Sequence, residues 1–363
     1  MPRIIEPQKR QELKIKMLKI LGINARTSNS NLAKLLEIPK STAQMLFAEL
    51  VKEYDLHFTA EIGIEELWRW EFVKQARTYN KKGILEKVID NLPELGFEEF
   101  IIFLKFLDGS PSAEELSRAA GRSYIPQFVG MLHGEYDVVM YAVARNYDGA
   151  NRFVIELGKQ LHKYKVTSDL LNITRMYGFF PLGKKLIEQF HIPDTYEHIL
   201  MGLHNEGRME FSGIAKKFKH GLPHILYAYD RLKKTNILTR LTYYEGKPHN
   251  IFSVLIRIKI VNETDYFESR GMWFLDMVKN SENKHTNYTF MCDISNPQGI
   301  LLLMNFADGD AAESFVAKLR KLLRGAEISY FVLTKIVFGN LGVRDFDMKF
   351  TVQYKDVVRA KLL

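Results

Sequence analysis

The chain contains an internal repeat, which restricts the possible fold more than any other feature of the sequence. Residues near the N-terminus have counterparts 182 positions later, so the segments 32–56 and 214–238 align without a gap. Arg26 aligns with Arg208, where one apolar helical pattern has stopped and a second is about to begin at Ile214. Self-similarity at a fixed spacing indicates duplicated structural units. The stretch around Arg208 is therefore the first helix boundary of a second copy.

Each copy is predicted to contain three helices. In the first copy, Thr27, Ser28 and Ser30 are candidate caps for a short second helix, and a tight turn at 37–39 leads into the third. The predicted inward residues of the third helix are Ala43, Leu46, Phe47 and Leu50. Two short helices joined by a tight turn are typical of a helix-turn-helix, and residues 56–64 are predicted to form a wing strand. A small helical bundle with no binding role is the alternative.

The segments that follow the two copies are also paired. The first is predicted to contain a strand at 97–106, a helix at 112–123, two strands within 125–145, a helix at 148–163 and a strand within 166–179. The second is predicted to contain a strand at 251–260, a helix at 267–279, strands near 288–294 and 299–306, a helix at 310–323 and a strand at 328–338. Each half therefore has the strand-helix-strand-strand-helix-strand order of a ferredoxin-like sandwich.

The predicted fold class is α+β, with two winged helix-turn-helix domains alternating with two ferredoxin-like (βαββαβ) sandwiches. The predicted domains are winged helix-turn-helix 1 (1–64), a helical insert (65–96), sandwich 1 (97–190), winged helix-turn-helix 2 (191–246) and sandwich 2 (247–363). The apolar strands 100–106 and 252–258 have more hydrophobic surface than one sheet face can hide. We therefore expect the sandwiches to form an internal pseudo-dimer, with both wings pointing to one side.

Charge and cysteine content favour a cytoplasmic protein with an anionic partner. The net charge is +8, and residues 1–56 carry ten Lys and Arg against six Asp and Glu. The single cysteine, Cys292, excludes an internal disulfide framework and suits a reducing compartment. The N-terminal stretch lacks a signal-peptide pattern, and the most apolar runs are too short to span a bilayer. We therefore expect no membrane association.

The order of elements resembles the Lrp/AsnC family of transcription regulators. The resemblance is carried by residues 20–56 and 199–218, and by "HGEYDVVMYAVAR" (133–145), which is similar to the Gly-x-Tyr-Asp strand pair of that family. It implies a DNA-binding regulator whose sandwiches pair through their sheets and which responds to a small effector such as an amino acid. On this interpretation the chain is not an enzyme and needs no cofactor or metal, its partner is double-stranded DNA, and further homodimerisation is open.

Two departures from the family pattern affect the sites. The family usually has arginines in the middle of the recognition helix, where this chain has Met45-Leu46 and Tyr227-Ala228. Since arginine is the commonest reader of guanine edges, we expect modest sequence discrimination. The second sandwich has "NPQGI" (296–300) in place of Gly-x-Tyr-Asp. We therefore expect at most one effector site per chain.

The candidate DNA-binding residues lie at equivalent places in the two copies. Hydroxyl, amide and basic side chains suit phosphate oxygens, and glutamine suits adenine. The candidates are Lys40, Ser41, Thr42 and Gln44 in the first copy, and Lys219, His224, Tyr227, Arg231 and the wing residue Arg240 in the second. The alternative for each of them is an ordinary solvated position. Metal binding by His220 and His224 is not expected, because Gly221 and Pro223 indicate a turn between them.

The candidate effector-binding residues are Gly134, Tyr136 and Asp137, which the family resemblance indicates. Asp137 would accept a hydrogen bond from an ammonium group, and backbone amides around Gly134 would bind a carboxylate. The alternative is a hairpin turn with an aromatic residue at a strand edge.

Two other functions stay open. The same domain plan also resembles the siroheme decarboxylases, which use His and Arg around a tetrapyrrole, although the first sandwich shows no matching His/Arg cluster. A protein–protein adaptor is the third alternative, because it fits the missing arginines.

Overall fold

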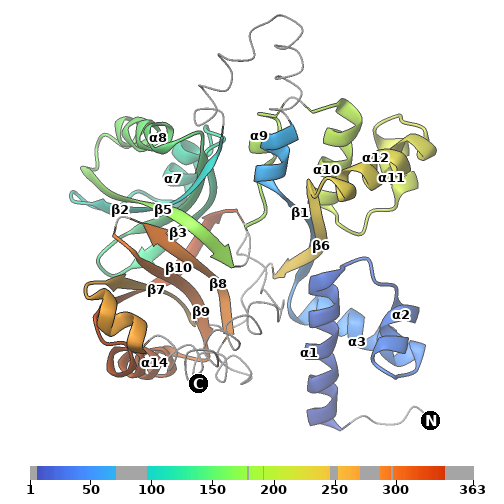
Figure 1. Ribbon diagram of the computed structural model, residues 1–363, viewed down its shortest axis with the longest axis horizontal. Coiled ribbons are helices and arrows are strands. Elements are labelled where there is room, and N and C mark those ends of the chain that lie inside the picture. Colours follow the sequence, from blue (N-terminus) through green and yellow to red (C-terminus); the bar gives the residue numbers. More distant parts are fainter. Residues whose placement is uncertain are drawn as a thin grey trace, which may run out of the picture. The chain divides into compact units, whose positions relative to one another are not determined.

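The computed structural model describes residues 6–70, 96–177, 180–190, 192–245, 252–269, 287–295 and 297–339 (Figure 1). The chain forms two compact units, and each is built from two separate segments. Unit 1 comprises Met1–Glu71 and Ile187–His249, and unit 2 comprises Phe72–Leu186 and Asn250–Leu363. Unit 1 thus holds both helix-turn-helix copies and unit 2 holds both sandwiches. The predicted limits of the five sequential domains stay predictions; of the helical insert, residues 65–70 are described and are helical.

Copy 1 of unit 1 has the predicted three helices and strand. These are α1 (Pro7–Ile23), α2 (Asn29–Leu35), α3 (Lys40–Glu53) and β1 (Leu56–Ile62). Ser28 caps α2 by accepting a hydrogen bond from the backbone N–H of Asn31. Ala43, Leu46 and Leu50 are the buried residues of α3, whereas Phe47 is half-buried. The helices therefore pack mainly through the predicted face.

Copy 2 repeats this arrangement with α10 (Asp194–Asn205), α11 (Phe211–Lys217), α12 (Leu222–Lys234) and β6 (Leu238–Glu245). The backbone repeats as well, because Glu37 and Lys219, which are 182 residues apart, both have left-handed φ values, of 54° and 56°. Each of these residues lies in the tight turn before the third helix of its copy. The duplication therefore extends to the turn geometry of the helix-turn-helix.

The two predicted wing strands pair with each other. β1 and β6 form a two-stranded antiparallel ribbon that runs from Leu56 opposite Glu245 to Ile62 opposite Leu238, with a register shift between Glu61 and Ile62. The sequence pattern predicted both strands but not their pairing. Pairing the strands satisfies backbone groups that two free wings would expose to solvent.

Unit 2 contains the two predicted sandwiches. The first consists of β2 (Glu98–Phe106), α7 (Ala113–Ala120), β3 (Pro126–His133), β4 (Val138–Ala144), α8 (Tyr147–Gln160) and β5 (Val166–Tyr177), and the short α9 (Lys184–Ile187) follows at the boundary with unit 1. The second consists of β7 (Phe252–Ile260), helical residues 263–269, β8 (Asn287–Ser295), β9 (Gly299–Phe306), α14 (Gly309–Leu322) and β10 (Ala326–Phe338). The helix predicted at 267–279 therefore begins earlier, and most of its predicted length lies outside the described residues.

The two four-stranded sheets join into one closed barrel. The strand order is β10-β3-β4-β2-β5-β8-β9-β7, and the halves meet where β5 pairs with β8 and where β10 pairs with β3. Closure removes the free strand edges that two separate sandwiches would expose. The two sandwiches are therefore associated within the chain, as a pseudo-dimer requires.

Helices cover the outer face of each half of the barrel (Figure 1). α7 and α8 pack on the first sheet, and α14 packs on the second. The side chain of Asn146 caps α8 and that of Asp308, 162 residues later, caps α14. Both halves therefore follow the same local design. Among the described helices, none is long and apolar enough to cross a bilayer.

Candidate nucleic-acid interface

The first turn of α3 presents polar side chains at an open helix end. Lys40, Ser41 and Gln44 are exposed, and Thr42 is half-buried. The N-cap residue is Pro39, no side chain caps the helix, and the first turn has no acidic residue. The unpaired N–H groups and the positive end of the helix dipole therefore face outward without a competing carboxylate in that turn. Such an end is suited to a phosphate oxygen.

The equivalent turn of α12 is open in the same way but has a different chemistry. Its N-cap is Gly221, with no side-chain cap and no acidic residue in the first turn. His224, Tyr227 and Arg231 are exposed, and Lys219 is exposed in the preceding turn. Leu222 and Leu226 are also exposed, by 41% and 44%. The second interface candidate therefore combines basic residues with an apolar edge.

Arg240 belongs to the ribbon and not to a free wing. It is half-buried and forms an ion pair with Glu61, its neighbour across β1 and β6. A charge that is already paired within the protein is less available to DNA phosphates. Arg240 is therefore a weaker candidate for DNA binding than the exposed residues on α12.

Arg208, which the repeat first drew attention to, joins the two copies. Its guanidinium donates a hydrogen bond of 2.8 Å to the backbone oxygen of Ala25 and lies over the rings of Phe47 and Phe58, 4.7 and 5.2 Å from their centroids. Burial, followed by the nearby charge of Arg26, lowers the pKa of Arg208. The side chain therefore bridges copy 2 to three elements of copy 1.

Arg26, the counterpart of Arg208 in copy 1, contacts copy 2 in turn, but through one aromatic ring. Its guanidinium lies 4.2 Å from the centroid of Phe211 in copy 2. Among the described residues, its buried Nη1 has no hydrogen-bond partner. The backbone crosses over as well, since Ala25 N–H donates to the oxygen of Leu241 and Gly207 N–H donates to that of Phe58. The two helix-turn-helix copies are therefore held together as one body, which the sequence pattern did not predict.

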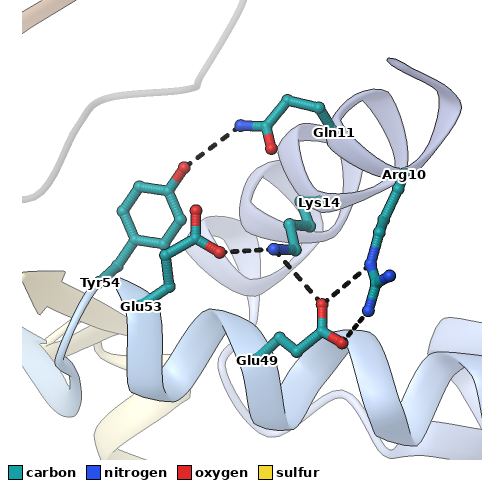
Figure 2. A network of polar contacts seen from close by, with 6 residues as sticks. All are labelled: Arg10, Gln11, Lys14, Glu49, Glu53 and Tyr54. Atoms are coloured by element: carbon teal, nitrogen blue, oxygen red, sulfur yellow. Dashed lines mark hydrogen bonds and ion pairs between the residues drawn. The ribbon is translucent and has the colours of Figure 1, made fainter. Parts of the chain in front are cut away.

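A charged network holds α1 against α3 in copy 1 (Figure 2). Arg10 pairs with Glu49, and the Lys14 ammonium lies 3.3 Å from Glu49 and 2.5 Å from Glu53. The hydrogen bond from Arg10 lowers the pKa of Glu49. Burial alone would lower the pKa of Lys14, but its bonds to Glu53 and Glu49 outweigh burial and raise it. These four charges therefore neutralise one another away from the open end of α3.

Copy 2 contains a histidine contact that the sequence pattern did not reveal. His198 Nδ1 lies 2.8 Å from His220 Nε2, and the His198 ring stacks on Phe218. His198 lies on α10 and His220 follows α11, so only the tertiary fold brings them together. No group of three potential metal ligands converges among the described residues.

The effector candidates lie where β3 turns into β4. Gly134 has φ of +142°, in the range that favours glycine. Asp137 accepts a hydrogen bond of 2.7 Å from the backbone N–H of Phe106, and its other carboxylate oxygen lies 3.6 Å from the Lys105 ammonium. Asp137 therefore already helps to hold the turn to β2. The amino-acid effector stays a prediction.

Tyr136 takes part in a polar cluster that joins the two sandwiches. Its hydroxyl donates a hydrogen bond of 2.5 Å to Asp169 on β5, and Asp169 also accepts a bond of 3.1 Å from Arg257 on β7. Burial, followed by the bond to Asp169, raises the pKa of Tyr136 to about 12. The Arg257 side chain is 11% exposed. Sequence reasoning found Tyr136 but missed Asp169 and Arg257, because they lie far apart in the chain.

Side chains from both halves of the barrel line one small cavity. Aromatic and aliphatic residues such as Phe128, Tyr141, Phe180 and Phe290 leave a cavity of about 10 Å³, close to the smallest that holds one water molecule. Tyr141 hydrogen-bonds with Glu99, and burial raises the pKa of both groups. This cavity therefore has room for no more than about one water molecule.

Neither a protein-family model nor a curated protein matches the sequence. Two solved structures match nearly the whole chain: the siroheme decarboxylase NirDL, and the same enzyme in complex with an iron-uroporphyrin III analogue. Their TM-scores are 0.50 and 0.52 at 14% and 12% identity, and they cover 97% of this chain and 100% and 99% of theirs. A regulator of the AsnC family from Pyrococcus furiosus, PF0864, matches 40% of this chain and 91% of its own, with a TM-score of 0.33 and 19% identity. At these identities the full-length likeness shows a shared fold.

The full-length matches correct one prediction. The sequence was interpreted as that of a protein that is not an enzyme, with the decarboxylases as an alternative. Two solved structures that match along nearly the full length of the chain are those of an enzyme. The exclusion of an enzyme is therefore wrong.

Proposed function

We propose that the protein binds duplex DNA through unit 1. The observation that carries this proposal is the pair of helix-turn-helix copies held as one body, each with an exposed third helix that starts without a cap or an acidic residue. Two such helices in a fixed arrangement are suited to two neighbouring stretches of major groove. A regulatory role in transcription is part of this proposal and follows from the resemblance of its elements to the Lrp/AsnC plan.

The charge of unit 1 supports binding that is driven mainly by phosphate contacts. Residues 1–56 carry ten Lys and Arg against six Asp and Glu, and residues 194–245 carry eight against six. Since phosphate contacts release counterions, the affinity should fall steeply as salt rises. The shortage of exposed arginine on α3 is consistent with modest discrimination between sequences.

Fluorescence anisotropy of the full chain with labelled duplexes tests the proposal across a salt series. The double variant Lys40→Ala, Gln44→Ala should weaken binding without lowering the melting temperature, because both side chains are exposed. Lys52→Ala is the matched control, since Lys52 is exposed at the other end of α3. Absence of duplex binding at low salt would refute the proposal.

A second candidate function, a reaction on a tetrapyrrole, is favoured by the full-length likeness to NirDL. In unit 2, Arg257 and Tyr136 are two groups suited to a carboxylate, and both bond to Asp169. With its pKa raised to about 12, Tyr136 keeps its proton at neutral pH.

Titration with iron-uroporphyrin III, followed by the change in its Soret absorption, tests this second candidate. Arg257→Gln should weaken binding of the polycarboxylate, whereas Lys259→Gln should not, because Lys259 lies further along β7 in an exposed ion pair with Glu327. A spectrum unchanged by the protein would exclude the tetrapyrrole function. It would leave DNA binding to be judged by the anisotropy experiment.

A further inference from the structure

The two recognition helices come from one chain and are held in one fixed body. The β1–β6 ribbon, the bond from Gly207 to Phe58 and the bond from Arg208 to Ala25 all cross between the copies. A homodimer would present the same helix twice, and a symmetric pair of helices matches a palindromic site. In this protein α3 and α12 carry different side chains at equivalent exposed positions.

The difference lies at the equivalent positions that point away from the core. Where α3 has Lys40, Gln44 and Met45, α12 has Leu222, Leu226 and Tyr227. Leu222, Leu226 and Tyr227 are 41%, 44% and 62% exposed. Their exposure is not a packing requirement, because the buried face of α12 is formed by Ile225, Ala228 and Leu232.

These two sets of side chains suit different base edges. In the major groove, lysine pairs with the acceptors of guanine and glutamine with the adenine edge, whereas apolar side chains contact the thymine methyl group. The start of α3 is therefore suited to purine edges, and the start of α12 to thymine methyls. The last turn of α12 is basic, with Arg231, Lys233 and Lys234, of which Lys234 forms an ion pair with Asp230.

We propose that unit 1 reads a non-palindromic duplex made of two unlike half-sites at a fixed spacing. Copy 1 reads purine edges through Lys40 and Gln44, and copy 2 reads thymine methyl groups through Leu222 and Leu226. This inference rests on the proposed function, because it specifies which DNA the same surface takes. The fixed spacing follows from the contacts that join the copies.

The test begins with selection of bound duplexes from a random library by the full chain. The selected sequences should contain two different half-sites at one spacing. Thymine is then replaced by deoxyuridine, which lacks only the methyl group, in one half-site at a time. Each replacement in the copy 2 half-site should weaken binding about fourfold, the effect expected for one buried methyl. Replacements in the other half-site should have little effect.

Variants then assign each half-site to its helix. Leu222→Ala with Leu226→Ala should abolish the sensitivity to deoxyuridine, and Gln44→Ala should relax the preference for adenine in the other half-site alone. Ile155→Ala, which alters an exposed residue of α8 in unit 2, is the matched control.

The outcomes separate this inference from the proposed function. A palindromic consensus, variable spacing or equal sensitivity to deoxyuridine in both half-sites would overturn the inference while leaving DNA binding intact. A library from which no duplex is retained would instead refute DNA binding itself. Binding of a partner protein through Leu222 and Leu226, with DNA binding unaffected by their loss, would also overturn the inference.

Discussion

The two helix-turn-helix copies share an interior and differ on their surfaces. Equivalent positions that are buried in both copies include Leu18 and Leu200, Leu21 and Leu203, Leu32 and Ile214, Leu46 and Ala228, and Leu50 and Leu232. Some exposed pairs are identical, such as Lys34 with Lys216, but at the start of the third helix they are unlike, such as Lys40 with Leu222. Close packing limits what a buried position accepts, whereas an exposed one is free to change. The duplication has therefore kept one fold while giving it two different faces.

Removing equivalent core side chains should have the largest effect and should show whether the interiors are energetically alike. Leu50→Ala and Leu232→Ala each delete a fully buried side chain, so each should lower the free energy of unfolding by about 2–5 kcal/mol. Urea unfolding followed by circular dichroism measures the change, with the exposed Met45→Ala as control. A large loss for one variant and almost none for the other would contradict equivalent interiors.

The second prediction concerns the two arginines, which are equivalent in sequence but not in bonding. Arg208→Ala should lower the free energy of unfolding by about 2–3 kcal/mol, because it strands a carbonyl oxygen of the turn after α1 and removes contacts with two rings. Arg26→Ala removes one ring contact and should lower it by about 1 kcal/mol or less. Thermal unfolding measures the two effects. An equal loss of stability for the two variants would show that the additional contacts of Arg208 do not stabilise the protein.

A third prediction concerns Gly207, where the backbone of copy 2 contacts that of copy 1. A Cβ at this position would lie 2.7 Å from the backbone nitrogen of Thr59 and 2.9 Å from its oxygen, so the backbone must move. Gly207→Ala should therefore destabilise the protein by about 1–2 kcal/mol. Gly213→Ala is the control, because a Cβ within α11 would meet only Met209 at 3.6 Å and alanine favours the helix. Destabilisation by both substitutions would argue against a specific close approach at Gly207.

These comparisons also show what the sequence was able to predict. Periodic apolar residues such as Leu46 and Leu50 identify a helix and its buried face, and Ser28 was among the predicted caps. β9 was placed at its observed bounds, Gly299–Phe306, because a short apolar run bounded by turn residues is a strong local signal. These predictions succeeded because they depend on neighbours in the sequence. The full-length likeness to NirDL supports the same α+β plan.

Contacts between distant segments were not predictable in this way. An apolar strand pattern shows which side chains are buried but not which strand lies beside them, so the pairing of β1 with β6 and the closure of the barrel by β5 with β8 were missed. Asp169 and Arg257 were absent from the effector prediction for the same reason, because only the tertiary fold brings them to Tyr136. Asp137 was interpreted as a ligand for an ammonium group, but its bond to the Phe106 N–H depends on a strand 31 residues away.

The charged network of α1 and α3 has no counterpart in copy 2. The positions equivalent to Arg10, Lys14 and Glu49 are occupied by Ile192, Tyr196 and Arg231. Figure 2 shows that Glu49 accepts bonds from both Arg10 and Lys14, so the ionised carboxylate is the form that the fold favours. Copy 1 therefore has a source of acid sensitivity that copy 2 lacks.

The smallest expected effect is the pH dependence of this network. The pKa of Glu49 is lowered in the folded protein, chiefly by its bond with Arg10, so its contribution is fully present above the ordinary value of 4.5. It is lost as the pH falls below 4.5 through the lowered pKa of the folded state. Since the pair is partly exposed and screened by solvent, Glu49→Gln should lower the melting temperature at pH 7 by only a few degrees. At pH 3 the gap between the variant and the wild type should shrink, whereas Arg231→Gln in copy 2 should show no such convergence. A gap for Glu49→Gln that stays constant from pH 7 to pH 3 would mean that the carboxylate stabilises copy 1 through packing and not through its charge.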